Sequence, residues 1–245
     1  MKKSLALKQK FLLITGWGCG IQPLEPLKKA LEQRGHAVEL WNIFNALDQH
    51  ILQQKVALAH GFDVIVGWSL GGQLATLLVE QIELRYTEQK VLISLASNPC
   101  FVADTTWQIA MSSLNFQQFK HSFEQDHIAT LKKFGYMMCQ GMSTLKPDFL
   151  TLQNLIQPQP ILLLKQGLIL LEKLNTVSIL KKYAGHQYHI FAEQDTLVDY
   201  KITQKFAEFE AKFLKVTGIK GSHACPLFQT QQITDKICQY LQEIN

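Results

Sequence analysis

A serine between two glycines gives the strongest chemical signal in this sequence. Ser69 lies in the stretch G-W-S-L-G-G at residues 67–72, which fits the pattern G-x-S-x-G. In that pattern a sharp turn from a strand into a helix exposes the serine hydroxyl as a nucleophile. The apolar run at 63–66 and the helical pattern at 73–84 supply the two flanking elements. The alternative is a chance match, with a serine that only caps a helix.

A nucleophilic serine needs a base, and the base needs a group that orients it, because a free hydroxyl is a weak nucleophile. In strand-turn-helix sites the acid and the base follow the serine in that order, each after a later strand. Asp195 comes directly after the apolar run at 187–192, and His223 follows the run at 213–219. These positions predict Asp195 as the acid and His223 as the base.

Other side chains compete for both roles. Glu193 is the main competitor for the acid, whereas Asp199 is expected to begin the next helix. His186 and His189 lie at or within a predicted strand, where we expect a structural role. The remaining histidines are His36, His50, His60, His121 and His127, of which the last two fall in a helical segment.

Acyl transfer also requires two backbone N–H groups that stabilise an oxyanion. One comes from the residue after the nucleophile and one from the loop after an early central strand. These positions are Leu70 and Trp17, and Gly16 and Gly18 allow the backbone to turn inward around Trp17. The alternative for Trp17 is a turn with a core tryptophan.

The elements that must position these residues alternate between short apolar runs and helical patterns. This alternation predicts an α/β fold with a mostly parallel central sheet flanked by helices. Strands are predicted at 11–15, 37–41, 63–66, 90–96, 187–192 and 213–219, and helices at 24–34, 51–60, 73–84 and 233–244.

The alternation stops between residues 105 and 180, where helical spacing dominates. We predict a helical cap inserted over 105–180 into a core formed by 1–104 and 181–245. The run from Ile161 to Leu174 carries charges and is too short to span a membrane, so we expect a buried helix there. Aromatic and methionine side chains gather in the cap: Phe116, Phe119, Phe123, Phe134, Tyr136, Met137 and Met138.

Composition limits the remaining function classes. The 245 residues carry a net charge of +4 that is spread along the chain, which gives little support for nucleic-acid binding. Five cysteines without a C-x-x-C pair suggest neither a disulfide framework nor a metal cluster. No secretory signal is recognisable at the N-terminus, so we expect a cytoplasmic protein. We expect no metal and no organic cofactor, because a serine, acid and histidine supply the nucleophile, the base and the electrostatics by themselves.

Several stretches resemble the α/β-hydrolase superfamily, and more closely its biotin-pathway pimeloyl-[acyl-carrier protein] methyl ester carboxylesterases. They are G-W-G at 16–18, G-W-S-L-G-G at 67–72, L-A-S-N-P-C-F at 95–101, D-T-L-V at 195–198 and S-H-A-C-P at 222–226. The resemblance covers nearly the whole chain in order and is loose in the cap.

The resemblance implies a monomeric serine esterase that removes a methyl group from an acyl chain held by acyl carrier protein. It implies Ser69, Asp195 and His223 as the triad and Trp17 and Leu70 as oxyanion donors. It also implies substrate contacts from Trp17, Trp68, Leu70 and Phe134. Lys133 and Lys146 correspond to cap positions that meet the acidic carrier protein, although solvated helix faces are an equal alternative.

Three departures from the family pattern stand out. Thr15 replaces the usual histidine before G-W-G, the N-terminal strand hairpin is shortened or absent, and the cap has lysines where the family favours arginines. A general short-chain carboxylesterase or acyl thioesterase with the same triad is the alternative function. A non-catalytic binding protein is disfavoured because serine, acid and histidine are all in place.

Overall fold

The centre of the molecule is a sheet of parallel strands. The computed structural model describes residues 8–244, and within them the sheet has six strands in the order β2-β1-β3-β4-β5-β6. All neighbouring strands pair in parallel. The strands are β1 Lys10–Ile14, β2 Ala37–Trp41, β3 Val64–Trp68, β4 Val91–Leu95, β5 Gln187–Ala192 and β6 Leu214–Ile219. The predicted α/β class and all six predicted strands are confirmed, with bounds that differ by at most two residues.

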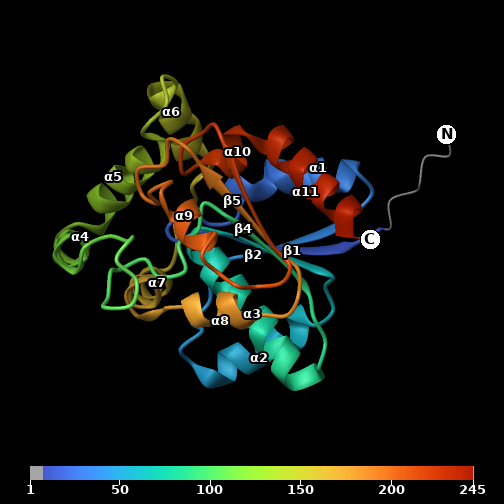
Figure 1. The fold of residues 1–245 in the computed structure, drawn as a ribbon. Helices are drawn as coiled ribbons and strands as arrows, with labels where there is room; N and C mark the ends of the chain where they lie inside the picture. Colours follow the sequence, from blue (N-terminus) through green and yellow to red (C-terminus); the bar gives the residue numbers. More distant parts are fainter. Residues whose placement is uncertain (1–7, 245) are drawn as a thin grey trace.

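Helices cover both faces of this sheet (Figure 1). On one face lie α1 Glu25–Gln33, α10 Cys225–Phe228 and α11 Thr230–Ile244. On the other lie α2 Gln49–Ala59, α3 Leu70–Tyr86 and α8 Val177–Lys182. The short helices η1 Gln22–Leu24 and α9 Ile202–Phe206 complete the core.

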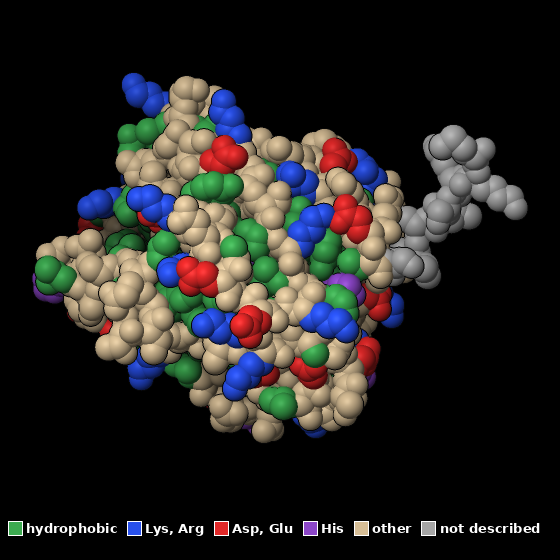
Figure 2. All heavy atoms as spheres, viewed as in Figure 1, with side chains coloured by type: hydrophobic (Ala, Val, Ile, Leu, Met, Phe, Trp, Pro, Cys, Tyr) green, Lys and Arg blue, Asp and Glu red, His purple; other side chains and the backbone are tan. Residues whose placement is uncertain are grey.

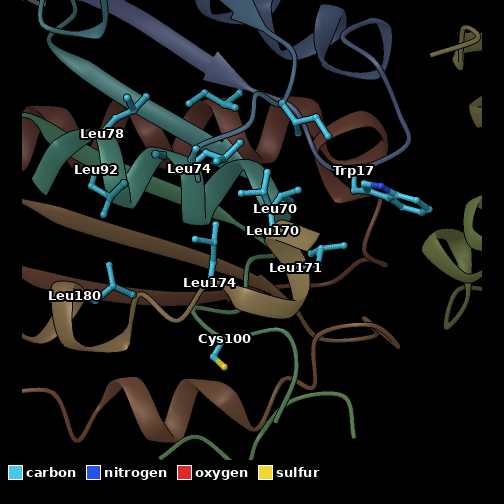
Figure 3. Packing of buried hydrophobic residues seen from close by; sticks show 14 of the residues in the cluster. Trp17, Leu70, Leu74, Leu78, Leu92, Cys100, Leu170, Leu171, Leu174 and Leu180 are labelled. Atoms are coloured by element: carbon cyan, nitrogen blue, oxygen red, sulfur yellow. The ribbon is translucent and has the colours of Figure 1, made fainter. Parts of the chain in front are cut away.

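The two faces of the sheet bury separate apolar clusters because strand side chains alternate in direction. Phe11 and Leu13 of β1 pack with α1 and α11, while Leu12 and Ile14 pack on the α3 side. Figure 3 shows the α3 side, where leucines along α3 face leucines of the segment that leads into α8. Burying apolar area in this way is the main driving force that holds the layers together.

Four further helices project from the carboxyl end of the sheet, at the left of Figure 1. They are α4 Ser113–Gln125, α5 His127–Cys139, α6 Leu145–Leu155 and α7 Ile161–Lys173. They fall within the segment for which the sequence predicts a cap, and they are its only long helices in the described part of the chain. α7 and α8 also pack on α3, so the C-terminal part of the predicted insertion covers the sheet.

Three details of the helix predictions are wrong, and one is the start of α11, which lies at Thr230 rather than at residue 233. α3 begins at Leu70 rather than at residue 73, because Gly71 and Gly72 are helical despite the low helix propensity of glycine. α7 is half-buried rather than buried: Leu164 and Leu168 lie in the core, whereas Leu162 is 64% exposed. Residues 1–7, where the sequence suggests a shortened N-terminal hairpin, lie outside the described residues.

Candidate active site

Ser69 lies in the sharp turn between β3 and α3. Its backbone has φ 55° and ψ −124°, a strained conformation for a residue with a side chain. Hydrogen bonds from the surroundings hold this conformation. The Ser69 N–H donates to the carbonyl oxygen of Leu95 at 3.0 Å, and the Ser97 hydroxyl donates to the Ser69 carbonyl oxygen at 2.7 Å. The turn therefore presents the serine hydroxyl at the carboxyl edge of the sheet.

The glycines on either side of Ser69 are required by close backbone packing. A Cβ atom at Gly67 would lie 2.0 Å from the carbonyl oxygen of Gly71, and one at Gly71 would lie 2.2 Å from that of Ile14. Real Cβ atoms do not approach backbone that closely, so only glycine fits at these two positions. This explains the fixed glycines of the pattern that the sequence displays.

A chain of hydrogen bonds joins Ser69 to His223 and Asp195. The distance between Ser69 Oγ and His223 Nε2 is 2.9 Å, and that between His223 Nδ1 and Asp195 Oδ2 is 2.7 Å. All three residues are buried, with exposed fractions of 5%, 1% and 8% in that order. The structure thus brings together three residues that are up to 154 positions apart in sequence.

The other oxygen of Asp195 fixes the acid in place. Asp195 Oδ1 accepts backbone N–H groups of Leu197 at 2.8 Å and Val198 at 3.0 Å. The competing acids are not part of this arrangement. Glu193 is exposed, and Asp199 accepts the backbone N–H of Lys201 just before α9.

The loop that follows β1 lies directly against Ser69. A Cβ atom at Gly16 would be 3.0 Å from Ser69 Cβ and 3.6 Å from Ser69 Oγ. This proximity places the backbone at Gly16 beside the serine. Thr15, which departs from the family pattern, closes the same loop by donating its hydroxyl to the Gly20 carbonyl oxygen at 2.6 Å.

Known structures share this architecture over almost the whole chain. A bromoperoxidase from Bacillus anthracis superposes with a TM-score of 0.82 at 15% identity, covering 97% of this chain and 93% of that chain. An esterase from Exiguobacterium antarcticum superposes with a TM-score of 0.76 at 16% identity, covering 96% and 92%. The chain has the α/β-hydrolase fold. The likeness shows the fold alone, since the identities are low.

A sequence relative adds a closer similarity. The pimeloyl-[acyl-carrier protein] methyl ester esterase of Shewanella woodyi is 28% identical over 234 residues, which is 91% of this chain and 90% of that protein. No family model matches the sequence. The α/β-hydrolase fold and the relative agree with the resemblance that the sequence motifs indicate.

Trp68 occupies a different place from the one that the resemblance implies. Its side chain is 1% exposed and lies among the core residues on the α1 and α11 side of the sheet. Its indole N–H donates to the backbone carbonyl oxygen of His223 at 2.9 Å. Trp68 therefore contacts His223 through the backbone of the histidine, and its side chain does not line the cavity at Ser69. The reason is strand alternation, which directs neighbouring side chains at a strand end to opposite faces. Leu70 likewise buries its side chain in the core and does not line the cavity at Ser69.

A small apolar cavity opens above Ser69 and His223. Its volume is about 50 Å³. The helices α4, α5 and α7 contribute five of its eleven wall residues, and Trp17 and Phe134, which the resemblance implies as substrate contacts, are part of the wall. Further wall residues were not singled out as site residues by the sequence: Phe101, Met111, Phe116, Phe119, Met137, Leu171 and Leu197. The gathering of aromatic and methionine residues in the cap was the signal that could have found three of them, namely Phe116, Phe119 and Met137.

A larger and more polar groove of about 840 Å³ continues outward from this cavity. Met111, Phe119, Met137 and Leu197 line both spaces. Lys133 lies on the groove, whereas Lys146 is exposed on α6 and lines neither space. The site thus combines an apolar inner part at the serine with a polar outer part at the surface.

The Cys225 thiol lies buried next to the base loop. Burial raises the pKa of the Cys225 thiol well above its usual range, and the carboxylate of Asp195 raises it further.

Within residues 8–244 no group of three or more His, Cys, Asp or Glu side chains is arranged to hold a metal ion. In the same range, no helix has the length and apolar character needed to cross a membrane.

Proposed function

We propose that the protein is a serine carboxylesterase that hydrolyses the methyl ester of pimeloyl-[acyl-carrier protein] in biotin biosynthesis. The observation that carries the chemistry is the hydrogen-bond chain Ser69, His223, Asp195 at the base of an apolar cavity. The substrate comes from the name of the Shewanella woodyi relative, which aligns with nine tenths of the chain. The products are methanol and pimeloyl-[acyl-carrier protein].

In this proposal Ser69 Oγ attacks the ester carbonyl carbon while His223 Nε2 takes the hydroxyl proton. Asp195 keeps the Nδ1 proton of His223 in place and stabilises the imidazolium that forms. The backbone N–H groups of Trp17 and Leu70 donate to the oxyanion, and the start of α3 adds a favourable dipole. His223 then returns the proton to the departing methanol oxygen, and water repeats the sequence on the acyl-serine.

The cavity and groove support an acyl chain that runs outward from Ser69. The inner cavity is far smaller than an ordinary ligand pocket, so it accommodates only a short group beside the serine. The remaining chain would pass Phe119 and Met137 into the polar groove, toward a carrier protein at the surface. We propose that one chain acts alone, because one chain supplies all three members of the hydrogen-bond chain Ser69, His223 and Asp195. We place the reaction in the cytoplasm, since the five cysteines are free thiols, as a reducing compartment keeps them.

Replacing the nucleophile tests the reaction. We expect Ser69→Ala to lower kcat for methyl pimeloyl-[acyl-carrier protein] by roughly 10⁴-fold or more, with an unchanged thermal unfolding midpoint. Hydrolysis is followed by methanol release. Turnover close to that of the wild type would rule out Ser69 as the nucleophile. Fast cleavage of short p-nitrophenyl esters by the wild type, without cleavage of the carrier-bound methyl ester, would favour a general short-chain esterase or thioesterase.

We further propose that Lys133 and Lys146 meet the acidic carrier protein. Both are exposed, and Figure 2 shows basic side chains on the projection that α5 and α6 form. The double variant Lys133→Glu, Lys146→Glu should raise KM for the carrier-bound ester roughly tenfold and leave KM for free dimethyl pimelate unchanged. Lys29→Glu on α1, an exposed lysine outside the cap, is the matched control. An equal loss on both substrates would contradict a carrier-docking role.

A further inference from the structure

The end of α5 touches the loop that carries the acid. We define the α5 C-terminal turn as residues 137–141. The Thr196 hydroxyl, next to Asp195 in sequence, donates to the carbonyl oxygen of Met137 at 3.2 Å. On the other side of Asp195, Gln194 packs so closely on Gly141 that a Cβ atom there would lie 2.0 Å from the Gln194 carbonyl oxygen. Both neighbours of the acid therefore contact this one turn.

The same turn touches the loop of the base. The backbone N–H of Ala224, the residue after His223, donates to the carbonyl oxygen of Met138 at 3.0 Å. The acid and base loops are also joined to each other. The Gln194 N–H donates to the Gly221 carbonyl oxygen at 3.0 Å, and the Gly221 N–H donates to Gln194 Oε1 at 2.8 Å. The α5 C-terminal turn thus holds a pair of loops that are linked at their ends.

The turn also reaches the loop beside the serine. Cys19 Sγ lies 3.7 Å from Met138 Sδ and 3.3 Å from the Trp17 carbonyl oxygen. Met138 and Cys19 are both 1% exposed, so this contact is fully buried. All three loops around Ser69 therefore meet one turn of the cap.

In addition to these loop contacts, α5 forms part of the wall of the cavity. Phe134 and Met137 line the apolar cavity, and Lys133 lies on the outer groove. One helix therefore combines the surface that would meet an acyl chain with the turn that holds the acid and base loops. We propose that the α5 C-terminal turn is a positioning element that sets the distances from Asp195 to His223 and from His223 to Ser69. This inference rests on the proposed function, and it gives the α5 C-terminal turn a role in that function.

The geometry explains why a small displacement of this turn matters. Catalysis requires the reacting groups to be held within a fraction of an ångström, and a misplacement of about 1 Å can cost about 100-fold in rate. Gly141 has φ 94°, in the left-handed region that side chains rarely adopt. A side chain at this position must push the turn away from Gln194 and, through it, from Asp195.

Gly141→Ala tests the inference, with Gly135→Ala as the matched control. Gly135 lies on the same helix, and a Cβ atom there would meet its nearest neighbour, Phe149, at an ordinary 3.7 Å. We expect Gly141→Ala to lower kcat for a short p-nitrophenyl ester at least tenfold, with KM changed less than twofold. Gly135→Ala should keep both constants within twofold of the wild type. A kcat for folded Gly141→Ala within twofold of the wild type would overturn the proposal.

A milder pair of variants guards against misfolding at Gly141. Thr196→Val removes the hydroxyl that donates to Met137, whereas Thr196→Ser keeps it. We expect Thr196→Val to lower kcat three- to tenfold and to shift the downfield proton resonance of the His223 Nδ1–H, with both values restored in Thr196→Ser. An unchanged resonance and kcat in Thr196→Val would overturn the proposal even if Gly141→Ala does not fold.

The outcomes separate this inference from the proposed function. If Ser69→Ala abolishes activity while the Gly141 and Thr196 variants behave as the wild type, the esterase stands and the positioning role fails. If Ser69→Ala retains activity, the proposed function itself fails, whatever the other variants do.

Discussion

At the scale of single residues, Trp68 contributes to the site through its indole N–H. Its ring is buried in the core, and its hydrogen bond ends on the carbonyl oxygen of the residue that serves as base. Removing one partner of a buried hydrogen bond leaves the other unsatisfied, which costs about 1–3 kcal/mol. Part of that cost is expected to appear as a displaced His223.

Trp68→Phe is the variant that isolates this hydrogen bond, because it keeps an aromatic ring and removes the N–H. We expect kcat for a short p-nitrophenyl ester to fall roughly tenfold, with KM unchanged and a thermal unfolding midpoint lowered by a few degrees. Steady-state kinetics and a thermal melt measure these effects. A raised KM with unchanged kcat would instead indicate a substrate contact, as the family resemblance implies.

The sequence could identify Ser69, Asp195 and His223 as a group because a short motif and a fixed chain order mark them. It could not place the side chain of Trp68, since adjacency to the nucleophile does not say which face of the sheet a side chain enters. The same holds for Thr196 and Met138. Their contacts depend on how α5 packs over the loops, and no local pattern encodes that packing.

At the scale of elements, the strands of the core and the helical character of residues 105–180 were predictable, whereas the packing of the cap helices was not. Short apolar runs that alternate with helices form the strands of a buried, mostly parallel sheet, so the strands followed from their pattern. In the cap segment the sequence shows only apolar residues at helical spacing. Their aromatic side chains gave no indication that Phe119 on α4 and Phe134 on α5 both face Trp17, with ring centroids 5.6 Å and 5.0 Å from it.

These aromatic contacts also limit what the cavity can hold. The cluster around Trp17 fills the space above Ser69 and leaves a volume of about 50 Å³. Edge-to-face aromatic pairs each contribute about 0.5–1.5 kcal/mol beyond their buried area. The space beside Ser69 therefore admits only a short part of an acyl chain, and the rest of the chain lies in the groove in the proposed reaction.

At the scale of the whole molecule, a buried polar pair joins the two strands of the sheet beneath the site. The distance between Ser94 Oγ on β4 and His189 Nδ1 on β5 is 2.6 Å, and His189 is 1% exposed. Burial lowers the pKa of His189 from its usual 6.5 to about 3. The imidazole is therefore neutral in the folded protein, which agrees with the structural role expected for a histidine within a strand.

This burial makes folding sensitive to acid. Between pH 6.5 and about 3 the unfolded chain binds a proton at His189 that the folded chain does not, so the unfolding free energy falls as the pH is lowered through this window. The slope from one such group is about 1.4 kcal/mol per pH unit. Replacing the histidine with a residue that does not titrate should remove this contribution and leave that of the other groups.

When the pH is lowered from about 7 to about 5, the unfolding free energy of His189→Gln should therefore fall less than that of the wild type. The difference between the two losses should be about 2 kcal/mol. Denaturant unfolding of both proteins at the two pH values measures the difference. The loss of packing in the variant cancels, since it affects its stability equally at both pH values. If both proteins lose the same free energy, groups other than His189 carry the acid sensitivity, and the His189 imidazole accepts a proton while buried between β4 and β5.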